Sequence, residues 1–390
     1  MLRRRSLVAA LCAFGAALAP AAGAGAADPG PYVALGDSFT AAPLVLNQGV
    51  TPLGCFRSDR NYPSIVAFAI GVTQFRDASC SGATTEDMTR RQPVLLSANI
   101  PQFDALRPDA TLVTVGIGGN DVGLVGAVVR CLGLGLLAPT GKSCRRAFAK
   151  KGGGDRLAGA IDATGPKIAA TLDGIHARAP LARVLLVGYP NVAPDGKGCF
   201  PLVPLSPDDL VYLDEMLRRT NSVLARQAAA NGAEYVDTYS DSGGHDVCSP
   251  PGTRWFEGVV PTRLAAPVHP NAYGAAAMAR SVLRVLGRPQ PEPVLGSLAR
   301  SRATIAAGRA LRVSYTLSRA ASVTFALRRS RGRGRYTAAR ALVTVNGRPG
   351  DNAVPLSPAQ LGRRPGLYRL TAALATGATQ AVHFRIRRAR

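Results

Sequence analysis

The sequence is short of the residues from which metal sites are usually built. It holds 4 histidines in 390 residues, no Cys-x-x-Cys pair, and no histidine spacing of the kind that holds zinc. A Gly-x-Ser-x-Gly motif is also missing, which argues against the nucleophile turn of the α/β-hydrolases. Aromatic residues make up 6% of the chain, so platforms for stacking nucleic-acid bases are few. We expect no metal, no cofactor and no specific binding of nucleic acid.

Apolar runs long enough to span a bilayer are also missing. The run Leu7–Leu18 is short for a transmembrane helix. It follows three arginines at positions 3–5 and precedes small residues that end in Ala26 and Ala27. A charged start, a short apolar run and small residues are the pattern of a secretory signal peptide. We expect residues 1–27 to be cleaved off near Ala26 or Ala27, and the mature protein to be secreted.

Export changes how the cysteines are interpreted. Cys12 leaves with the signal, and six cysteines remain in an oxidising compartment. An even number there predicts three disulfides, although the count alone leaves about fifteen pairings open. The six are Cys55, Cys80, Cys131, Cys144, Cys199 and Cys248.

Acidic residues almost disappear near the C-terminus. The net charge is +23, and residues 291–390 hold nineteen arginines against Glu292 and Asp351, so the mature chain before them is nearly neutral. A GC-rich coding sequence explains such arginine content equally well. Basic surfaces bind anionic polymers mainly through charge. We expect this segment to bind weakly to an acidic envelope polymer or anionic lipid. We also expect the protein to be a monomer.

A proline-rich stretch divides the chain. Residues 288–297 contain Pro289, Pro291 and Pro293, which cannot continue the helix predicted before them. Across residues 28–287, apolar runs typical of strands alternate with helical patterns, which predicts a parallel sheet with helices on both faces. The predicted strands are Tyr32–Leu35, Thr111–Val115, Arg183–Val187 and Glu234–Val236, and the predicted helices are Tyr62–Ile70, Leu157–Ala177, Pro207–Asn231 and Ala272–Leu286.

Beyond this linker the apolar pattern changes to a period of two. Residues 298–390 contain several such alternating runs and no helical pattern. This predicts a small arginine-rich β-sandwich as a second domain. The alternating sets are Val313, Tyr315 and Leu317; Val323, Phe325 and Leu327; Tyr368, Leu370 and Ala372; and Val382, Phe384 and Ile386.

The first predicted strand runs directly into GDSFTA, residues 36–41. Ligands bind at the carboxyl ends of the strands in such sheets, so Ser38 stands where a substrate would meet it. A serine there is a nucleophile if a base reaches it and a helix cap if none does. The candidate base is His269 in LAAPVHPNAYG, residues 264–274.

Two glycine-containing stretches supply candidate donors for an oxyanion. SCSGATT, residues 79–85, places Gly82 in a loop where its backbone N–H can face a substrate. VGIGGND, residues 115–121, places the amide of Asn120 just after a buried strand. Donors held where negative charge develops are the main requirement of acyl transfer. Each stretch alone is equally a turn, but their order between the serine and the histidine favours an acyl-transfer site.

With these motifs the sequence resembles the SGNH, or GDSL-type, family of esterases and lipases, and within it the secreted actinobacterial members. The motifs GDSFTA, SCSGATT, GIGGND, GHDVC and HPNAYG carry the resemblance, which spans roughly residues 31–287. It implies a flavodoxin-like three-layer α/β fold and hydrolysis of carboxylic esters without a metal. It also implies that the cysteines pair in sequence order, as Cys55–Cys80, Cys131–Cys144 and Cys199–Cys248.

The resemblance also implies a role for each site residue. Ser38 attacks the ester carbonyl while His269 takes its proton. The oxyanion is held by the backbone N–H groups of Ser38 and Gly82 and by the side-chain amide of Asn120. Many family members orient the histidine with an aspartate three positions earlier, where this chain has Ala266.

Another group must therefore orient the ring of His269. A backbone carbonyl is sufficient to hold one tautomer, and we expect that of Ala266 or Pro267 to do so, as in the secreted actinobacterial branch. The alternative is Asp246, which a bridge between Cys199 and Cys248 would bring near.

The motifs do not choose among the substrates of the family. The first hypothesis is a secreted serine esterase or lipase, and phospholipase A and carbohydrate O-deacetylase are alternatives within the family. A different alternative is an inactive hydrolase-like protein that binds the envelope. It is disfavoured because all four family positions are filled.

Overall fold

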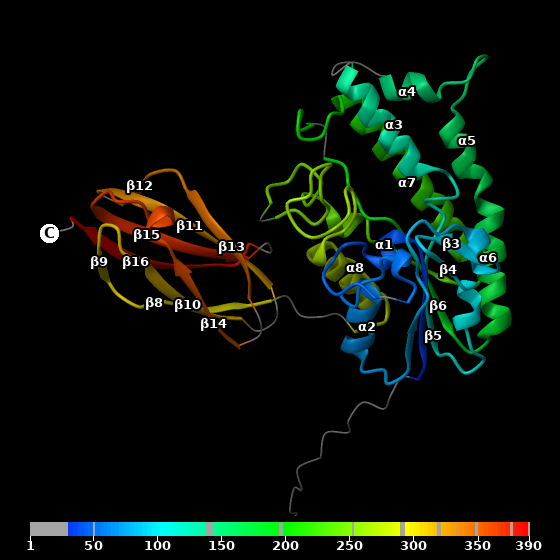
Figure 1. Cartoon of the computed structure of the whole chain (residues 1–390), viewed down its shortest axis with the longest axis horizontal. Helices are drawn as coiled ribbons and strands as arrows, with labels where there is room; N and C mark the ends of the chain where they lie inside the picture. The colour runs from blue at the N-terminus through cyan, green and yellow to red at the C-terminus, as the bar shows by residue number, and fades with distance from the viewer. Residues whose placement is uncertain are drawn as a thin grey trace, which may run out of the picture.

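Figure 1 shows the computed structural model, in which an α/β part is followed along the chain by an all-β part. The structure describes residues 30–49, 51–137, 143–194, 198–251, 253–288, 293–317, 321–332, 334–347, 350–374 and 377–388. The predicted signal, residues 1–27, lies outside the described residues. In the described ranges, no helix combines the length and the apolarity needed to cross a membrane.

The α/β part is built on a parallel sheet, as predicted. In the described residues its strands follow the order β2-β1-β5-β6-β7, and every neighbouring pair is parallel. The carboxyl ends of β1 and β5 pair in register, which brings the two loops that follow them to one edge. The strands are β1 (Tyr32–Gly36), β2 (Phe75–Asp77), β5 (Leu112–Gly116), β6 (Arg183–Val187) and β7 (Glu234–Val236).

Helices cover both faces of this sheet, which gives three layers. The covering helices are α2 (Tyr62–Ile70), α6 (Gly165–Arg178), α7 (Pro207–Ala230) and α8 (Ala272–Val285). α2 and α8 pack in the core that contains Tyr32, and α6 and α7 pack in the core that contains Val33. Successive residues of a strand point to opposite faces, so a strand covered on both sides must be apolar throughout.

One of the predicted helices is two helices. Instead of a single helix over Leu157–Ala177, the structure has α5 (Arg156–Ala163) and α6, separated at Thr164. Pro166 stands in the first turn of α6. Proline lacks the N–H that a helix interior needs, but it suits a first turn, so the helix restarts there.

No helix is predicted for residues 124–148, where the structure has α3 (Leu124–Leu137) and α4 (Ser143–Phe148). Glycine is a poor helix former, and α3 contains Gly126, Gly133 and Gly135. Close packing compensates for this. α3 approaches the backbone of Pro204 so closely that a Cβ at Gly135 would lie 1.8 Å from the Pro204 carbonyl oxygen, so only glycine allows this contact. The disulfide Cys131–Cys144 joins α3 to α4.

The all-β part has the predicted alternation. Within the described residues, β14, β10 and β8 form one sheet, and β12, β11, β15, β16 and β9 form a second, with β13 paired to β11. Both sheets bury their inward residues in one shared core, which makes the part a sandwich. The elements are β8 (Leu295–Arg300), β9 (Thr304–Ala306), β10 (Leu311–Leu317), β11 (Ala321–Gly332), β12 (Arg335–Tyr336), β13 (Arg340–Gly347), β14 (Gly350–Leu356), α9 (Pro358–Leu361), β15 (Gly366–Leu374) and β16 (Thr379–Arg387).

The predicted linker is too long at its C-terminal end. Because β8 begins at Leu295, the last residues of the range 288–297 already belong to a strand. Residues 289–292, with two of the three prolines, lie outside the described residues.

Candidate active site

A tight turn at the end of β1 presents Ser38. Gly36 has a φ of +148°, and a Cβ there would lie 2.6 Å from a backbone carbonyl oxygen of β5, so glycine is required. Asp37 caps the one-turn helix α1 (Ser38–Ala41) by accepting the N–H of Phe39 at 2.9 Å. Ser38 is thereby held at the start of α1, where it is 7% exposed.

His269 lies within hydrogen-bond distance of Ser38. Its Nε2 is 2.8 Å from Ser38 Oγ, and its Nδ1 is 2.8 Å from the carbonyl oxygen of Pro267. A carbonyl only accepts, so Nδ1 carries the proton and Nε2 is free to take one from the serine. Burial lowers the pKa of His269 despite the opposing effect of the Pro267 carbonyl, which keeps the ring neutral near pH 7 and able to act as a base.

The three candidate orienters of His269 occupy different places. The carbonyl of Pro267 meets the ring, whereas the carbonyl of Ala266 accepts the backbone N–H of His269 at 3.2 Å. The carboxylate of Asp246 accepts two N–H groups of its own loop, at 2.7 and 3.1 Å. These contacts favour a dyad whose ring is oriented by Pro267.

The segment that carries His269 is paired with a second loop. The N–H of Val268 donates to the carbonyl of Glu257 at 2.9 Å, and the N–H of Glu257 donates to the carbonyl of His269 at 3.1 Å. The φ of Val268 is +61°, which is costly for a β-branched residue, so the surrounding contacts must impose it. Asn271 adds to them by capping α8 and donating to the buried Glu257 carboxylate at 2.8 Å. Glu257 stands in none of the sequence motifs, so its role is visible only in the fold.

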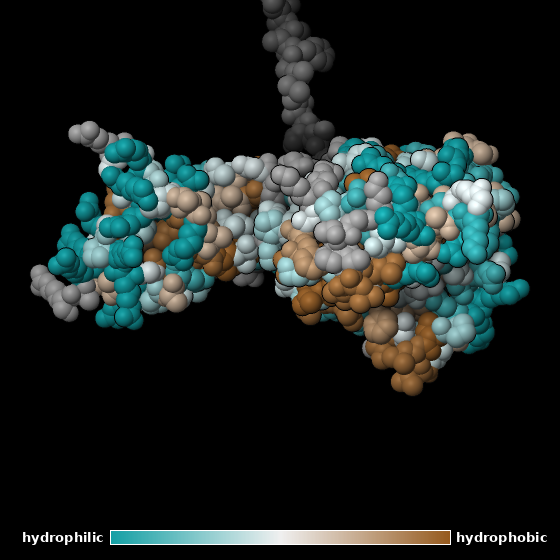
Figure 2. Space-filling model, turned by 90° about the horizontal axis from the view of Figure 1, so that it is seen from above, coloured by the Kyte–Doolittle hydropathy of each residue, from teal (hydrophilic) through white to brown (hydrophobic). Residues whose placement is uncertain are grey.

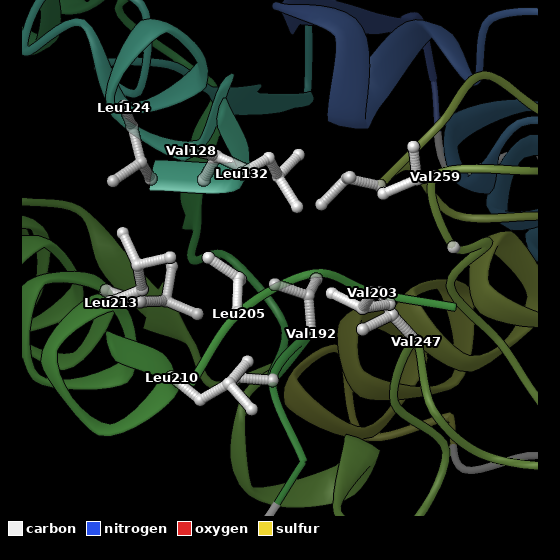
Figure 3. Close-up of a pocket in the computed structure, with 14 residues that line it drawn as sticks. Leu124, Val128, Leu132, Val192, Val203, Leu205, Leu210, Leu213, Val247 and Val259 are labelled. Carbon is white, nitrogen blue, oxygen red and sulfur yellow. The ribbon is translucent and has the colours of Figure 1, made fainter. Parts of the chain in front are cut away.

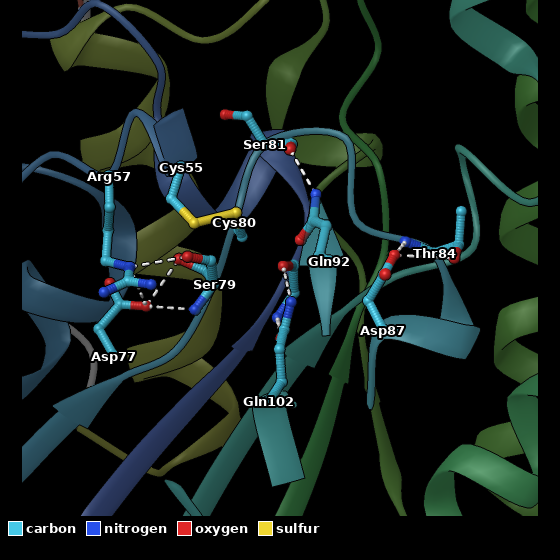
Figure 4. Close-up of a disulfide and its surroundings, with 11 residues drawn as sticks. Cys55, Arg57, Asp77, Ser79, Cys80, Ser81, Thr84, Asp87, Gln92 and Gln102 are labelled. Atoms are coloured by element: carbon cyan, nitrogen blue, oxygen red, sulfur yellow. Dashed lines mark hydrogen bonds and ion pairs between the residues drawn. A yellow bond between two sulfur atoms is a disulfide. The ribbon is translucent and has the colours of Figure 1, made fainter. Parts of the chain in front are cut away.

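The loop that contains Gly82 is held on both sides (Figure 4). The disulfide Cys55–Cys80 fixes its start, and the N–H of Ser81 donates to the carbonyl of Cys55 at 3.0 Å. On the other side, the amide of Gln92, in the short hairpin of β3 (Gln92–Val94) and β4 (Ser97–Asn99), donates to the carbonyl of Ser81 at 2.9 Å. This loop is therefore rigid without help from a substrate, which is what an oxyanion donor requires.

The candidate oxyanion donors remain available. Among the described residues, the N–H groups of Ser38 and Gly82 have no acceptor within the protein. One N–H of the Asn120 amide donates to the carbonyl of Ala83 at 2.9 Å, which leaves its second N–H. That contact also ties the loop after β5 to the Gly82 loop.

A buried network beneath the serine is a further feature that sequence reasoning missed. The hydroxyl of Tyr189 donates to Asp37 Oδ2 at 2.5 Å and accepts the N–H of Gly119 at 2.7 Å. Burial raises the pKa of Asp37 to about 7, although the bonds from Tyr189 and Phe39 favour its charged form. The network links the nucleophile turn to the loop that carries Asn120. Tyr189 and Asp37 are 152 residues apart, so no local spacing indicates their contact.

The remaining cysteines also pair in sequence order. Cys199–Cys248 joins the loop after β6 to the loop that contains Asp246. With Cys55–Cys80 and Cys131–Cys144, all six cysteines of the α/β part are therefore in disulfides.

A serine and a neutral histidine in contact at the carboxyl edge of a three-layer parallel sheet are typical of serine hydrolases. Comparison with known families gives the same class. Residues 34–277 match the model of the GDSL-like Lipase/Acylhydrolase family. The chain belongs to this family and is a carboxylic ester hydrolase. The match ends before the all-β part.

Individual relatives agree with this assignment. Lipase 2 of Streptomyces coelicolor is 38% identical over 296 residues, which cover 73% of this chain and 97% of that lipase. A phospholipase A1 from Streptomyces albidoflavus has a similar structure, with a TM-score of 0.55 and 26% identity over 67% of this chain and 99% of its own. An extracellular lipase from Streptomyces rimosus has a TM-score of 0.54 and 28% identity, with the same coverage.

Proposed function

We propose that this protein is a secreted esterase or lipase that forms an acyl-enzyme on Ser38. The observation that carries the proposal is the 2.8 Å contact between Ser38 Oγ and His269 Nε2, with Nδ1 held by a carbonyl. His269 takes the serine proton during attack on the ester and returns it to the leaving alcohol. Water then repeats the sequence on the acyl-enzyme. The N–H groups of Ser38 and Gly82 and the amide of Asn120 hold the oxyanion in both steps.

Secretion is supported by the signal pattern at residues 1–27 and by the three disulfides, which persist in oxidising compartments. Arginines on the all-β part support the further proposal that it holds the protein weakly at an acidic envelope polymer or anionic lipid. We propose a monomer, with the linker near residue 290 joining the hydrolase part to this basic part.

An apolar pocket beside the dyad supports a substrate with a fatty acyl group. Val268, which precedes the base, lines it together with Leu124, which follows the Asn120 loop. Figure 3 shows Val128 and Leu132 of α3 bordering the same cavity as Val203 and Val259, which come from two loops. The pocket has a volume of about 60 Å³ and its lining is apolar. An acetyl group needs no such pocket, so the lining favours a lipase or a phospholipase A over a carbohydrate O-deacetylase.

Acyl chain length is the most direct test of this pocket. With esters of one alcohol, we expect kcat/KM for a medium-chain acyl group to exceed that for acetyl by roughly tenfold or more, because each buried methylene is favourable. Leu132→Asn should reduce this ratio by placing a polar group in the pocket. A preference for acetyl esters, with turnover of acetylated glycan and none of phospholipid, would support the deacetylase instead.

Loss of the oxyanion amide tests the remaining part of the mechanism. We expect Asn120→Ala to lower kcat on a short-chain aryl ester by roughly 10²-fold or more, the cost of one oxyanion donor. KM should change less, because the donor acts mainly on the transition state. Asn47→Gly, which removes an exposed amide 3.4 Å from Asp59 at a position whose φ of +63° glycine accepts, is the control and should be near wild type. Unchanged turnover by the Asn120 variant would remove this residue from the site.

A further inference from the structure

Helix α3 exposes one apolar face and buries another. Its sequence LVGAVVRCLGLGLL contains a single charged residue, Arg130. One row of its side chains lines the apolar pocket, and the adjoining row, one residue further along the chain at each turn, faces solvent. The exposed side chains are Val125 (46% exposed), Val129 (62%), Leu136 (66%) and Leu137 (85%). A helix that is apolar all round is normally covered on all sides, so the outward row needs a partner.

Two loops that line the same pocket expose apolar side chains as well. Phe200 and Leu202 are 52% and 68% exposed in the loop that also provides Val203 to the pocket. Val260 is 75% exposed beside the pocket residue Val259. We call these residues and the outward row of α3 the apolar rim. On the face drawn in Figure 2, apolar side chains gather into one large area of the larger, α/β part.

The rim has a basic border. α4 and the turn that follows it carry Arg145, Arg146, Lys150 and Lys151, all exposed. Arg145 pairs with Glu215, whereas the other three have no carboxylate partner in the described part of the chain. The disulfide that joins α3 to α4 keeps these cations next to α3. An apolar face with adjoining cations fits the interface of a phospholipid bilayer, where headgroup phosphates lie above the acyl chains.

We propose that the apolar rim docks on a phospholipid surface, with α3 lying along the interface. This inference rests on the proposed function, because it supplies the route of the substrate. The rows of α3 that face lipid and pocket belong to the same helix, so an acyl chain passes from the bilayer into the pocket with little exposure to water. That route lowers the cost of extracting the chain, which rises with each methylene exposed to water.

Vesicle binding by an inactive enzyme tests the docking separately from catalysis. The full mature chain with Ser38→Ala is mixed with phosphatidylcholine vesicles, and the bound fraction is measured by sedimentation. Neutral lipid is used because the arginine-rich part would bind anionic lipid by charge. Adding Val129→Gln and Leu136→Gln should lower the partition coefficient by roughly tenfold or more, since two apolar side chains no longer enter the lipid.

Leu181→Gln is the matched control. Leu181 is 73% exposed but lies just before β6, at the amino edge of the sheet and away from the dyad. We expect it to leave vesicle binding unchanged. Equal binding by the rim variant and the control would overturn the proposal. So would a dimer that dissociates in the rim variant, because the rim would then be covered by a second copy of the chain.

Enzymes with Ser38 intact separate this inference from the proposed function. The rim variant should hydrolyse a soluble short-chain ester at the wild-type rate, which also shows that it is folded, and phospholipid vesicles more slowly. If the wild-type enzyme hydrolyses no ester, the proposed function fails, whereas the binding result still decides the docking. Equal rates of the two enzymes on vesicles would count against the rim.

Discussion

Alanine in place of Ser38 is expected to lower kcat on a soluble aryl ester by roughly 10⁵-fold or more, the scale of losing a nucleophile from a hydrolase. Its Oγ is the atom that meets His269 Nε2 at 2.8 Å, and it stands at the carboxyl edge of the sheet. A water molecule that fills the space of the lost hydroxyl is not held in position by α1, and it cannot form an acyl-enzyme. Active-site titration should detect no acylated protein, and circular dichroism should show an unchanged fold.

Ser81→Ala is the matched control for this prediction. Ser81 lies beside Gly82, and its buried hydroxyl has no hydrogen-bond partner among the described residues. Removing it should therefore change kcat by no more than roughly a few-fold. If Ser38→Ala kept more than about a tenth of wild-type activity while remaining free of wild-type contamination, another group would have to be the nucleophile.

His269→Ala is expected to lower kcat by roughly 10⁴-fold or more, because Ser38 then has no base to take its proton. In the native enzyme the base works only when neutral, so kcat/KM should fall as pH drops through the pKa of the ring. Burial lowers that pKa, which places the acid limb of the pH profile below the 6.5 of a free histidine. This limb should be missing from the residual activity of the alanine variant.

Two controls distinguish the dyad from a triad. His245→Ala removes a ring stacked on Trp255 with centroids 3.6 Å apart, and should leave the pH profile in place. Asp246→Asn should be mild, because its carboxylate serves its own loop while Pro267 orients the base. A loss of several orders of magnitude in kcat for Asp246→Asn, with the fold intact, would restore a triad.

Four of the five strands of the parallel sheet, and the helices that cover it, could be predicted from local pattern. β6 and β7 have the predicted bounds, and α2 begins and ends where predicted. These elements are apolar with a clear period, and their ends carry caps such as Ser206 before α7. Local pattern does not predict α3, because its glycines lower the helix propensity. The close packing of Gly135 on the backbone of Pro204 compensates for them, but it joins residues far apart in the sequence.

The sequence by itself determined which residues form the proposed site: a serine after the first strand, a histidine before the last α/β helix, and glycine and amide donors between them. Short motifs reveal such residues because each site residue needs a backbone conformation that its neighbours in the sequence produce. Tertiary structure alone decided that Pro267 rather than Asp246 meets the ring, that Tyr189 joins Asp37, and that Glu257 pairs with the base segment. These contacts join segments that are brought together only when the sheet and its covering helices pack, so no spacing along the chain encodes them.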